Sequence, residues 1–93
     1  MFGFSPLLMS TFRHRDRMTI FAEILKTTKE SKRGEKKTNI MHSVHLNYYQ
    51  ANKYLHLLLI NGFLYIDSAD RYKTTKKGLE FIKTLETLNL RIK

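Results

Sequence analysis

The junction between residues 60 and 63 restricts the fold of this 93-residue chain more than any other feature. A leucine-rich run with helical periodicity ends at Ile60, and Asn61 with Gly62 stops it, because these residue types readily take the backbone conformation that closes a helix. Residues 63–66 follow at once and favour a strand. The sequence therefore predicts a helix and a strand that are tightly coupled, since no loop separates them.

A β-hairpin is expected after this turn. Residues 67–70 supply a polar loop, and a second strand begins at Tyr72. Thr75 and Gly78 then open another amphipathic segment. A helix, a hairpin and a further helix thus follow one another directly, which places the first helix and the hairpin side by side.

Two more helices are predicted upstream. Asp16 can cap the first, whose apolar side chains over residues 20–25 fall on one face. Residues 27–37 are polar, rich in lysine and broken at Gly34, so they are expected to form a basic loop. Thr38 then offers a hydroxyl cap for a short helix with an inward face of Ile40, Met41 and Val44.

The leucine-rich helix has a well-marked start at Asn47. The Asn47 side chain can bond the amide of Gln50 while the Gln50 side chain reaches back, a variant of the capping box. Ala51, Tyr54 and the leucines repeat at core spacing. The other faces carry polar and aromatic residues, namely Tyr49, Gln50, Asn52, Lys53 and His56.

The last segment begins near Thr74 or Thr75 and runs to the C-terminus with apolar residues at steps of four and three. Leu79 and Ile82 widen this stripe, which indicates that the helix packs on its own domain near Leu79 and continues outward against a partner. A second copy of the chain is the simplest partner. The spacing is typical of a coiled-coil seam made of Phe81, Leu85, Leu88 and Ile92.

Composition limits the class of protein and its partners. The chain is long enough for one domain, and with 42% hydrophobic and 27% charged residues it is globular. Its 17 Lys and Arg residues against 8 Asp and Glu give a positive field that suits polyanions. The absence of cysteine excludes a disulfide framework and fits the cytoplasm. Residues 1–9 lack the features of a signal peptide, and no apolar run reaches the roughly 20 residues of a membrane-spanning helix.

An ordered set of residues runs from the second predicted helix to the start of the last: Lys37, Thr38, Ile40, Met41, Leu46, Tyr48, Tyr54, Leu55, Gly62, Phe63, Tyr72, Thr75 and Gly78. Together they resemble a family of small archaeal winged helix-turn-helix DNA-binding proteins, over the chain from about Arg17 onward. The resemblance implies an α+β, mainly helical fold with a three-helix core, a hairpin wing and a long C-terminal helix. It also implies homodimers joined by an antiparallel coiled coil, which act as transcriptional regulators or chromosome-associated proteins.

This interpretation divides the chain into a flexible arm at residues 1–15, a winged-helix DNA-binding domain at 16–78 and a dimerisation helix at 79–93. The N-terminal end of a recognition helix enters the major groove, where Asn and Gln can pair bidentately with adenine. The residues expected to read bases are Tyr49, Gln50, Asn52, Lys53 and His56.

Phosphate contacts are expected at two helix starts. Thr38 lies where a helix N-terminus can donate amides to a phosphate, with Lys37 beside it. Lys76 and Lys77 open the final helix, where cations oppose the positive end of the helix dipole. Helix stability does not account for these two lysines, whereas a bound phosphate would.

The hairpin tip is expected to act as the wing. Arg71 can reach a minor groove or a phosphate, and Lys73 lies beside it. Asp67 and Asp70 favour the opposite outcome, because carboxylates at the tip repel the phosphate backbone. The wing is therefore expected either to contact DNA or to set registration without adding affinity.

No catalytic or metal centre is expected. The sequence has no glycine-rich phosphate loop and no nucleophilic serine in an elbow pattern, and its carboxylates are scattered. His42 and His45 stand three apart, but no cysteine or clustered carboxylate completes a metal site. Neither enzyme activity nor a cofactor is predicted.

The leading hypothesis is a homodimeric protein that binds double-stranded DNA, without a membrane association, and regulates transcription. One alternative is an architectural protein spread over the nucleoid, and another is a winged-helix module that binds an acidic protein. A last alternative is binding of single strands by stacking on tyrosines, although Tyr54 and Tyr65 are expected in the core.

Overall fold

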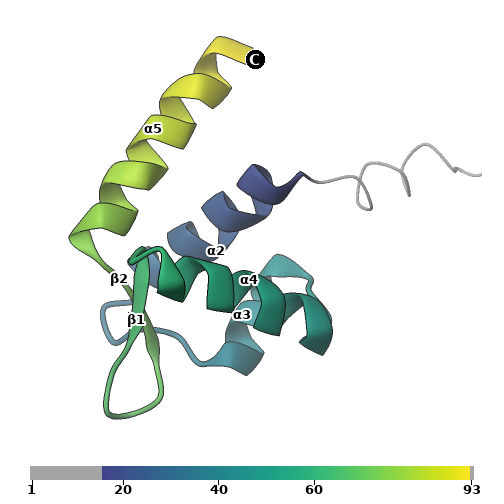
Figure 1. The fold of residues 1–93 in the computed structure, drawn as a ribbon, viewed down its shortest axis with the longest axis vertical. Helices are drawn as coiled ribbons and strands as arrows, with labels where there is room; N and C mark the ends of the chain where they lie inside the picture. Colours follow the sequence, from purple (N-terminus) through teal and green to yellow (C-terminus); the bar gives the residue numbers. More distant parts are fainter. Residues whose placement is uncertain (1–15, 93) are drawn as a thin grey trace, which may run out of the picture.

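The computed structural model describes residues 16–92, and the side chains of residues 16–88. Four helices and one antiparallel hairpin make a mainly helical α+β fold, which confirms the predicted winged-helix class (Figure 1). The predicted arm at residues 1–15 lies outside the described residues. In chain order the elements are α2 (Arg17–Glu30), α3 (Lys37–Val44), α4 (Tyr48–Ile60), β1 (Leu64–Ile66), β2 (Tyr72–Thr74) and α5 (Lys76–Ile92).

Two of the three predicted helix caps are confirmed. The Asp16 carboxylate accepts the backbone N–H of Thr19 at 2.7 Å at the start of α2. At the start of α4, Asn47 and Gln50 form the reciprocal capping box, with bonds of 2.8 and 3.1 Å. These side chains satisfy amides that the first helical turn leaves free.

The cap predicted at Thr38 is wrong. Helix α3 begins two residues earlier than a cap at Thr38 would give, with Lys36 at the N-cap and no side-chain capping bond. The reason lies in Glu35, whose backbone exchanges bonds of 2.9 and 2.7 Å with Tyr72 of β2. This pairing holds the chain extended up to Lys36, so the helix starts directly after it.

The basic loop predicted at residues 27–37 is shorter than expected, because α2 continues to Glu30. Thr28 is buried, and its hydroxyl donates to the Leu25 carbonyl at 3.0 Å. The hydroxyl of Thr74 on β2 lies against it and reaches the same carbonyl at 3.2 Å. A polar residue is tolerated inside because its hydrogen bonds are satisfied there.

The hairpin pairs Leu64 with Thr74, Tyr65 with Lys73 and Ile66 with Tyr72. Leu64 is buried, whereas Tyr65 is 46% exposed, since neighbouring residues of a strand point to opposite faces. The expectation that Tyr65 lies in the core is therefore wrong. Tyr54 does pack against the core, with its ring edge-on to Phe21 at 5.8 Å between centroids.

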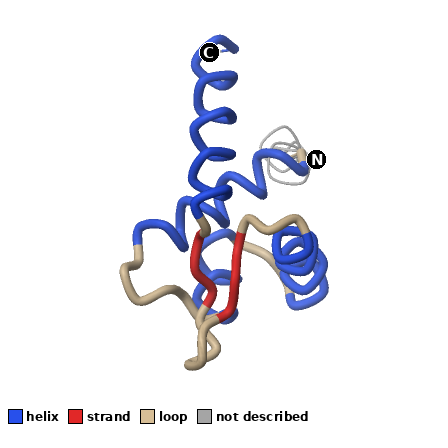
Figure 2. The backbone as a smooth tube through the Cα atoms, turned by 60° about the vertical axis from the view of Figure 1, so that its left-hand side comes forward, coloured by secondary structure: helices blue, strands red, loops and turns tan. Residues whose placement is uncertain are grey.

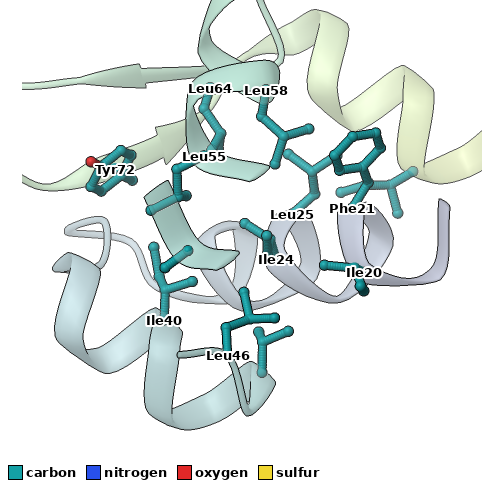
Figure 3. Packing of buried hydrophobic residues seen from close by; sticks show 13 residues of the cluster. Ile20, Phe21, Ile24, Leu25, Ile40, Leu46, Leu55, Leu58, Leu64 and Tyr72 are labelled. Atoms are coloured by element: carbon teal, nitrogen blue, oxygen red, sulfur yellow. The ribbon is translucent and has the colours of Figure 1, made fainter. Parts of the chain in front are cut away.

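One apolar cluster joins all four helices and the hairpin (Figure 3). Ile24 and Leu25 of α2 lie at its centre, between the inward faces of the other elements. The leucine and isoleucine side chains with essentially no exposure are Ile24, Leu25, Ile40, Leu55, Leu58 and Ile82. Burial of each such side chain contributes about 1.5–3 kcal/mol.

Helix α5 is fixed to the domain from its start to Glu86, whose carboxylate lies 3.6 Å from the Lys26 ammonium of α2. The Thr75 hydroxyl donates to the Gly62 carbonyl at 2.6 Å and accepts the Gly78 N–H at 3.0 Å, so it caps the helix. Ile82 is buried, but Leu79 is 42% exposed. The predicted packing of α5 on its own domain near Leu79 is confirmed, since Gly78 and Ile82 are buried there, although the Leu79 side chain itself stays partly exposed. Beyond this contact α5 extends away from the domain (Figure 1).

We expect Gly78→Ala to destabilise the fold although alanine favours a helix. A Cβ at Gly78 would overlap the Phe63 carbonyl oxygen and come within 2.7 Å of Thr74 Cγ2. Overpacking of this kind costs about 1–3 kcal/mol, against a helix-propensity gain of roughly 1 kcal/mol. The predicted net loss in the free energy of unfolding is up to about 2 kcal/mol in urea titrations.

Glu80→Ala, at an exposed position of the same helix, serves as the control and should change stability little. A Gly78→Ala variant as stable as the wild type would show that α5 does not need this close approach.

Candidate nucleic-acid interface

Helices α3 and α4 form a compact helix-turn-helix. The turn between them passes through His45, whose φ of 60° is left-handed, and the Leu46 N–H bonds back to the Met41 carbonyl at 2.9 Å. The buried face of α4 consists of Ala51, Leu55 and Leu58, which pack into the core. Its opposite face is therefore free for a partner.

The exposed face of α4 carries most of the predicted base-reading residues. Tyr49 is 74% exposed, and Lys53 and His56 are also exposed. The Lys53 ammonium lies 5.6 Å from the centre of the Tyr54 ring. These three predicted residues are brought together at the solvent-facing side of one helix.

Gln50 is tied into the helix start. Its side-chain oxygen accepts the Asn47 N–H, so the amide group that was predicted to read a base is already part of the capping box. A base contact through this oxygen would break that bond. The structure therefore gives Gln50 a structural role in addition to any contact with DNA.

Lys37 and Asn52 join α3 to α4. The Lys37 ammonium donates to the Asn52 side-chain oxygen at 2.6 Å and lies 5.2 Å from the centre of the Tyr48 ring. Tyr48 itself is 64% exposed. Sequence reasoning did not place Tyr48 among the base-reading residues, although its position four residues before Asn52 puts it on the same helix face.

The charge distribution favours an anionic partner on this side of the molecule. No Asp or Glu occurs from residue 36 to residue 66, a stretch that includes α3, α4 and β1. All eight carboxylates lie before or after it. The helix-turn-helix thus contributes only positive and neutral side chains to the local field.

The predicted wing cations contact their own domain. The Arg71 guanidinium lies 3.4 Å from the Gly34 carbonyl, and the Lys73 ammonium lies 3.5 Å from an Asp67 carboxylate oxygen. Asp67 also accepts the N–H groups of Arg71 and Ala69. Bonding to the Arg71 N–H, followed by Ala69 and Lys73, holds the pKa of Asp67 below its ordinary value.

The hairpin stands beside α4, which Figure 2 shows nearly end-on. Tyr72 of β2 is buried, which raises its pKa, with smaller contributions from Asp70 and Tyr48. Tyr72 therefore stays a neutral phenol near neutral pH.

The four predicted phosphate contacts fall at two separate places. Thr38 is exposed in the first turn of α3, and Lys37 lies next to it near the N-terminal end of α4. Lys77 is at the other end of α4, where its ammonium lies 5.3 Å from the Phe63 ring centre, and Lys76 precedes it. A helix of 13 residues separates the two places by about 20 Å.

The basic α2–α3 loop borders a different hollow, of about 390 Å³. The serine and threonine hydroxyls of the hollow are already bonded, since Ser31 donates to the Gly34 carbonyl at 2.8 Å and the hydroxyls of Thr28 and Thr74 both reach the Leu25 carbonyl. No residue of α3 or α4 lines it, so it is separate from the exposed face of α4. The lining residues are Thr28, Lys29, Ser31, Lys32, Tyr65, Lys73, Thr74 and Leu79.

The predicted dimer seam is partly occupied within the single chain. Phe81 stacks on Phe63 with 4.4 Å between ring centroids, and Leu85 is buried. Leu88 is 46% exposed, and the Ile92 side chain lies outside the described part. Of the seam residues whose side chains the structure describes, Leu88 is therefore the one left exposed for a partner.

Within residues 16–92, no three His, Cys, Asp or Glu side chains come together as a metal site. Over the same range, none of the helices combines the length and the apolar character needed to cross a membrane.

Comparison with known proteins agrees with this architecture. No curated protein matches the chain. A family model described as winged helix-turn-helix matches residues 14–93, a range that contains every helix and strand of the structure. The chain therefore belongs to the winged helix-turn-helix family.

Proposed function

We propose that this protein binds double-stranded DNA as a homodimer and regulates transcription from the nucleoid. The observation that carries the proposal is the carboxylate-free helix-turn-helix, whose second helix exposes Tyr49, Lys53 and His56. Winged helix-turn-helix domains typically bind DNA and are not enzymes, and a helix of this kind reads the major groove from its N-terminal end.

In this arrangement α4 supplies the base contacts. Tyr49 meets a thymine methyl group or a phosphate, while Lys53 and His56 meet guanine or the backbone. Asn52 faces the same groove from the edge of this surface that adjoins α3. Gln50 contributes mainly by holding the helix start, because its side-chain oxygen is engaged with Asn47.

Phosphates hold the domain on the duplex. Lys37 and the first-turn amides around Thr38 lie at the base-reading end of α4, where they can bind the strand that borders the groove. Lys76 and Lys77 bind a phosphate further along the duplex. Arg71 and Lys73 act from the wing only if they exchange their present partners, Gly34 and Asp67, for DNA.

The dimer forms through the projecting end of α5. Leu88 and Ile92 occupy successive seam positions beyond the part of α5 that packs on its own domain. Two copies joined there would present two recognition helices to one duplex.

We predict that binding to duplex DNA weakens steeply with salt. If about six phosphates are neutralised, log affinity falls with log salt at a slope near minus five, because bound cations displace condensed counterions. Fluorescence anisotropy over a salt series measures this slope. Lys53→Ala should reduce it by about one, whereas Lys83→Ala, an exposed lysine on α5, should leave it unchanged. A flat wild-type dependence would contradict the proposal.

We also predict that Leu88→Lys converts the dimer to a folded monomer. The side chain is exposed in the single chain, so the charge disrupts the seam without entering the core. Sedimentation equilibrium gives the mass, and circular dichroism checks the fold. Leu79→Lys introduces the same charge at an exposed position outside the seam and should remain dimeric. A wild-type protein that sediments as a monomer would refute this interface.

A further inference from the structure

The Lys37 ammonium determines which way the Asn52 side-chain amide is oriented. Lysine offers only hydrogen-bond donors, so the Asn52 atom 2.6 Å from the Lys37 ammonium must be the carbonyl oxygen. The NH₂ group of Asn52 consequently points the other way.

The Asn52 NH₂ group is available to a ligand. Among the described residues no hydrogen bond engages it. Three of its four neighbours one turn away on α4, Tyr48, Tyr49 and His56, are exposed, and the fourth, Leu55, is buried. Lys37 is itself steadied by the ring of Tyr48, since a cation over an aromatic face is attracted to it. The cluster of Lys37, Tyr48 and Asn52 thus presents two donors and a positive charge at the start of the recognition helix.

We propose that Lys37 fixes Asn52 as a donor-only group, so that Asn52 reads guanine and not adenine. This inference rests on the proposed binding of duplex DNA. Adenine pairs with an asparagine that both donates to N7 and accepts from the N6 amino group. Here the Asn52 oxygen accepts from Lys37 with one of its two lone pairs, and the adjacent ammonium repels the amino hydrogens that would approach the other. Guanine presents two acceptors, N7 and O6, in the same groove and suits two donors beside a cation.

The inference replaces the expectation that Asn52 pairs bidentately with adenine. It also gives Lys37 a second role, as a positioning residue for Asn52 in addition to a phosphate contact. Both roles use the same ammonium, which has three N–H donors and spends one of them on Asn52.

The test begins with selection of preferred duplexes from a random pool by the wild-type protein and by Asn52→Ala. The base pair at which Asn52→Ala loses selectivity defines the Asn52 position. We expect guanine there in the wild-type selection. Replacing it with 7-deazaguanine, which lacks the N7 acceptor, should weaken wild-type binding by about tenfold. Once that position is known, the affinity measurement uses only the wild-type protein.

Two variants test whether the orientation of the Asn52 amide, and not only the presence of the side chain, determines the preference for guanine. Asn52→Asp keeps the size and the acceptor for Lys37 but removes both donors, and should lose about tenfold or more on the guanine duplex. Lys37→Met releases the amide to rotate, so the preference for guanine over adenine should fall. Thermal unfolding of each variant confirms that the fold is retained.

The outcomes distinguish this inference from the function on which it rests. Absence of wild-type binding to any duplex would overturn the proposed function. Duplex binding with adenine selected at the Asn52 position, or with a guanine preference that Lys37→Met leaves unchanged, would overturn the orientation of Asn52 alone. The same holds if Asn52→Ala alters selectivity at no position.

Discussion

The backbone of Gly62 and Phe63 holds together α4, the hairpin and α5, the three elements on which the proposed function depends. The Phe63 N–H bonds to the Leu58 carbonyl of α4 at 2.9 Å, and the Phe63 carbonyl accepts the Thr75 N–H at 3.0 Å before α5. Gly62 takes a φ of 78°, which closes α4 and turns the chain into β1 without a loop. Because Gly78 allows α5 to approach this turn, the recognition helix, hairpin and C-terminal helix have one mutual arrangement.

This arrangement divides α4 into an anchored end and a presenting end. The C-terminal end is fixed by main-chain bonds to the hairpin and α5, so it cannot reorient independently. The N-terminal end is shaped by the capping box and by the bond from Lys37 to Asn52, and it carries Tyr48 and Tyr49 into solvent. A partner therefore meets a rigid surface whose donors are already oriented, which reduces the ordering cost of binding.

Local signals in the sequence were sufficient for much of the fold. The caps at Asp16 and Asn47 and the stop at Gly62 depend on neighbours within one helical turn, and the structure has all three. The bond between Lys37 and Asn52 joins residues of two helices, and it could not be anticipated because neither residue type specifies the other. The helical spacing of the apolar residues predicted which face of α4 is basic and aromatic. The hydrogen bonds that each side chain on that face makes, such as the bond from Lys37 to Asn52, depend on tertiary contacts.

The proposed function requires that the N-terminal half of α4 is the surface that contacts duplex DNA. Backbone amide chemical shifts, recorded while a short duplex is titrated into the protein, map that surface without any mutation. The predicted result is that the largest changes fall on residues 47–53 and on the first turn of α3, with smaller changes at the hairpin tip. Changes confined to α2 and α5, with the amides of α4 unaffected, would contradict the account.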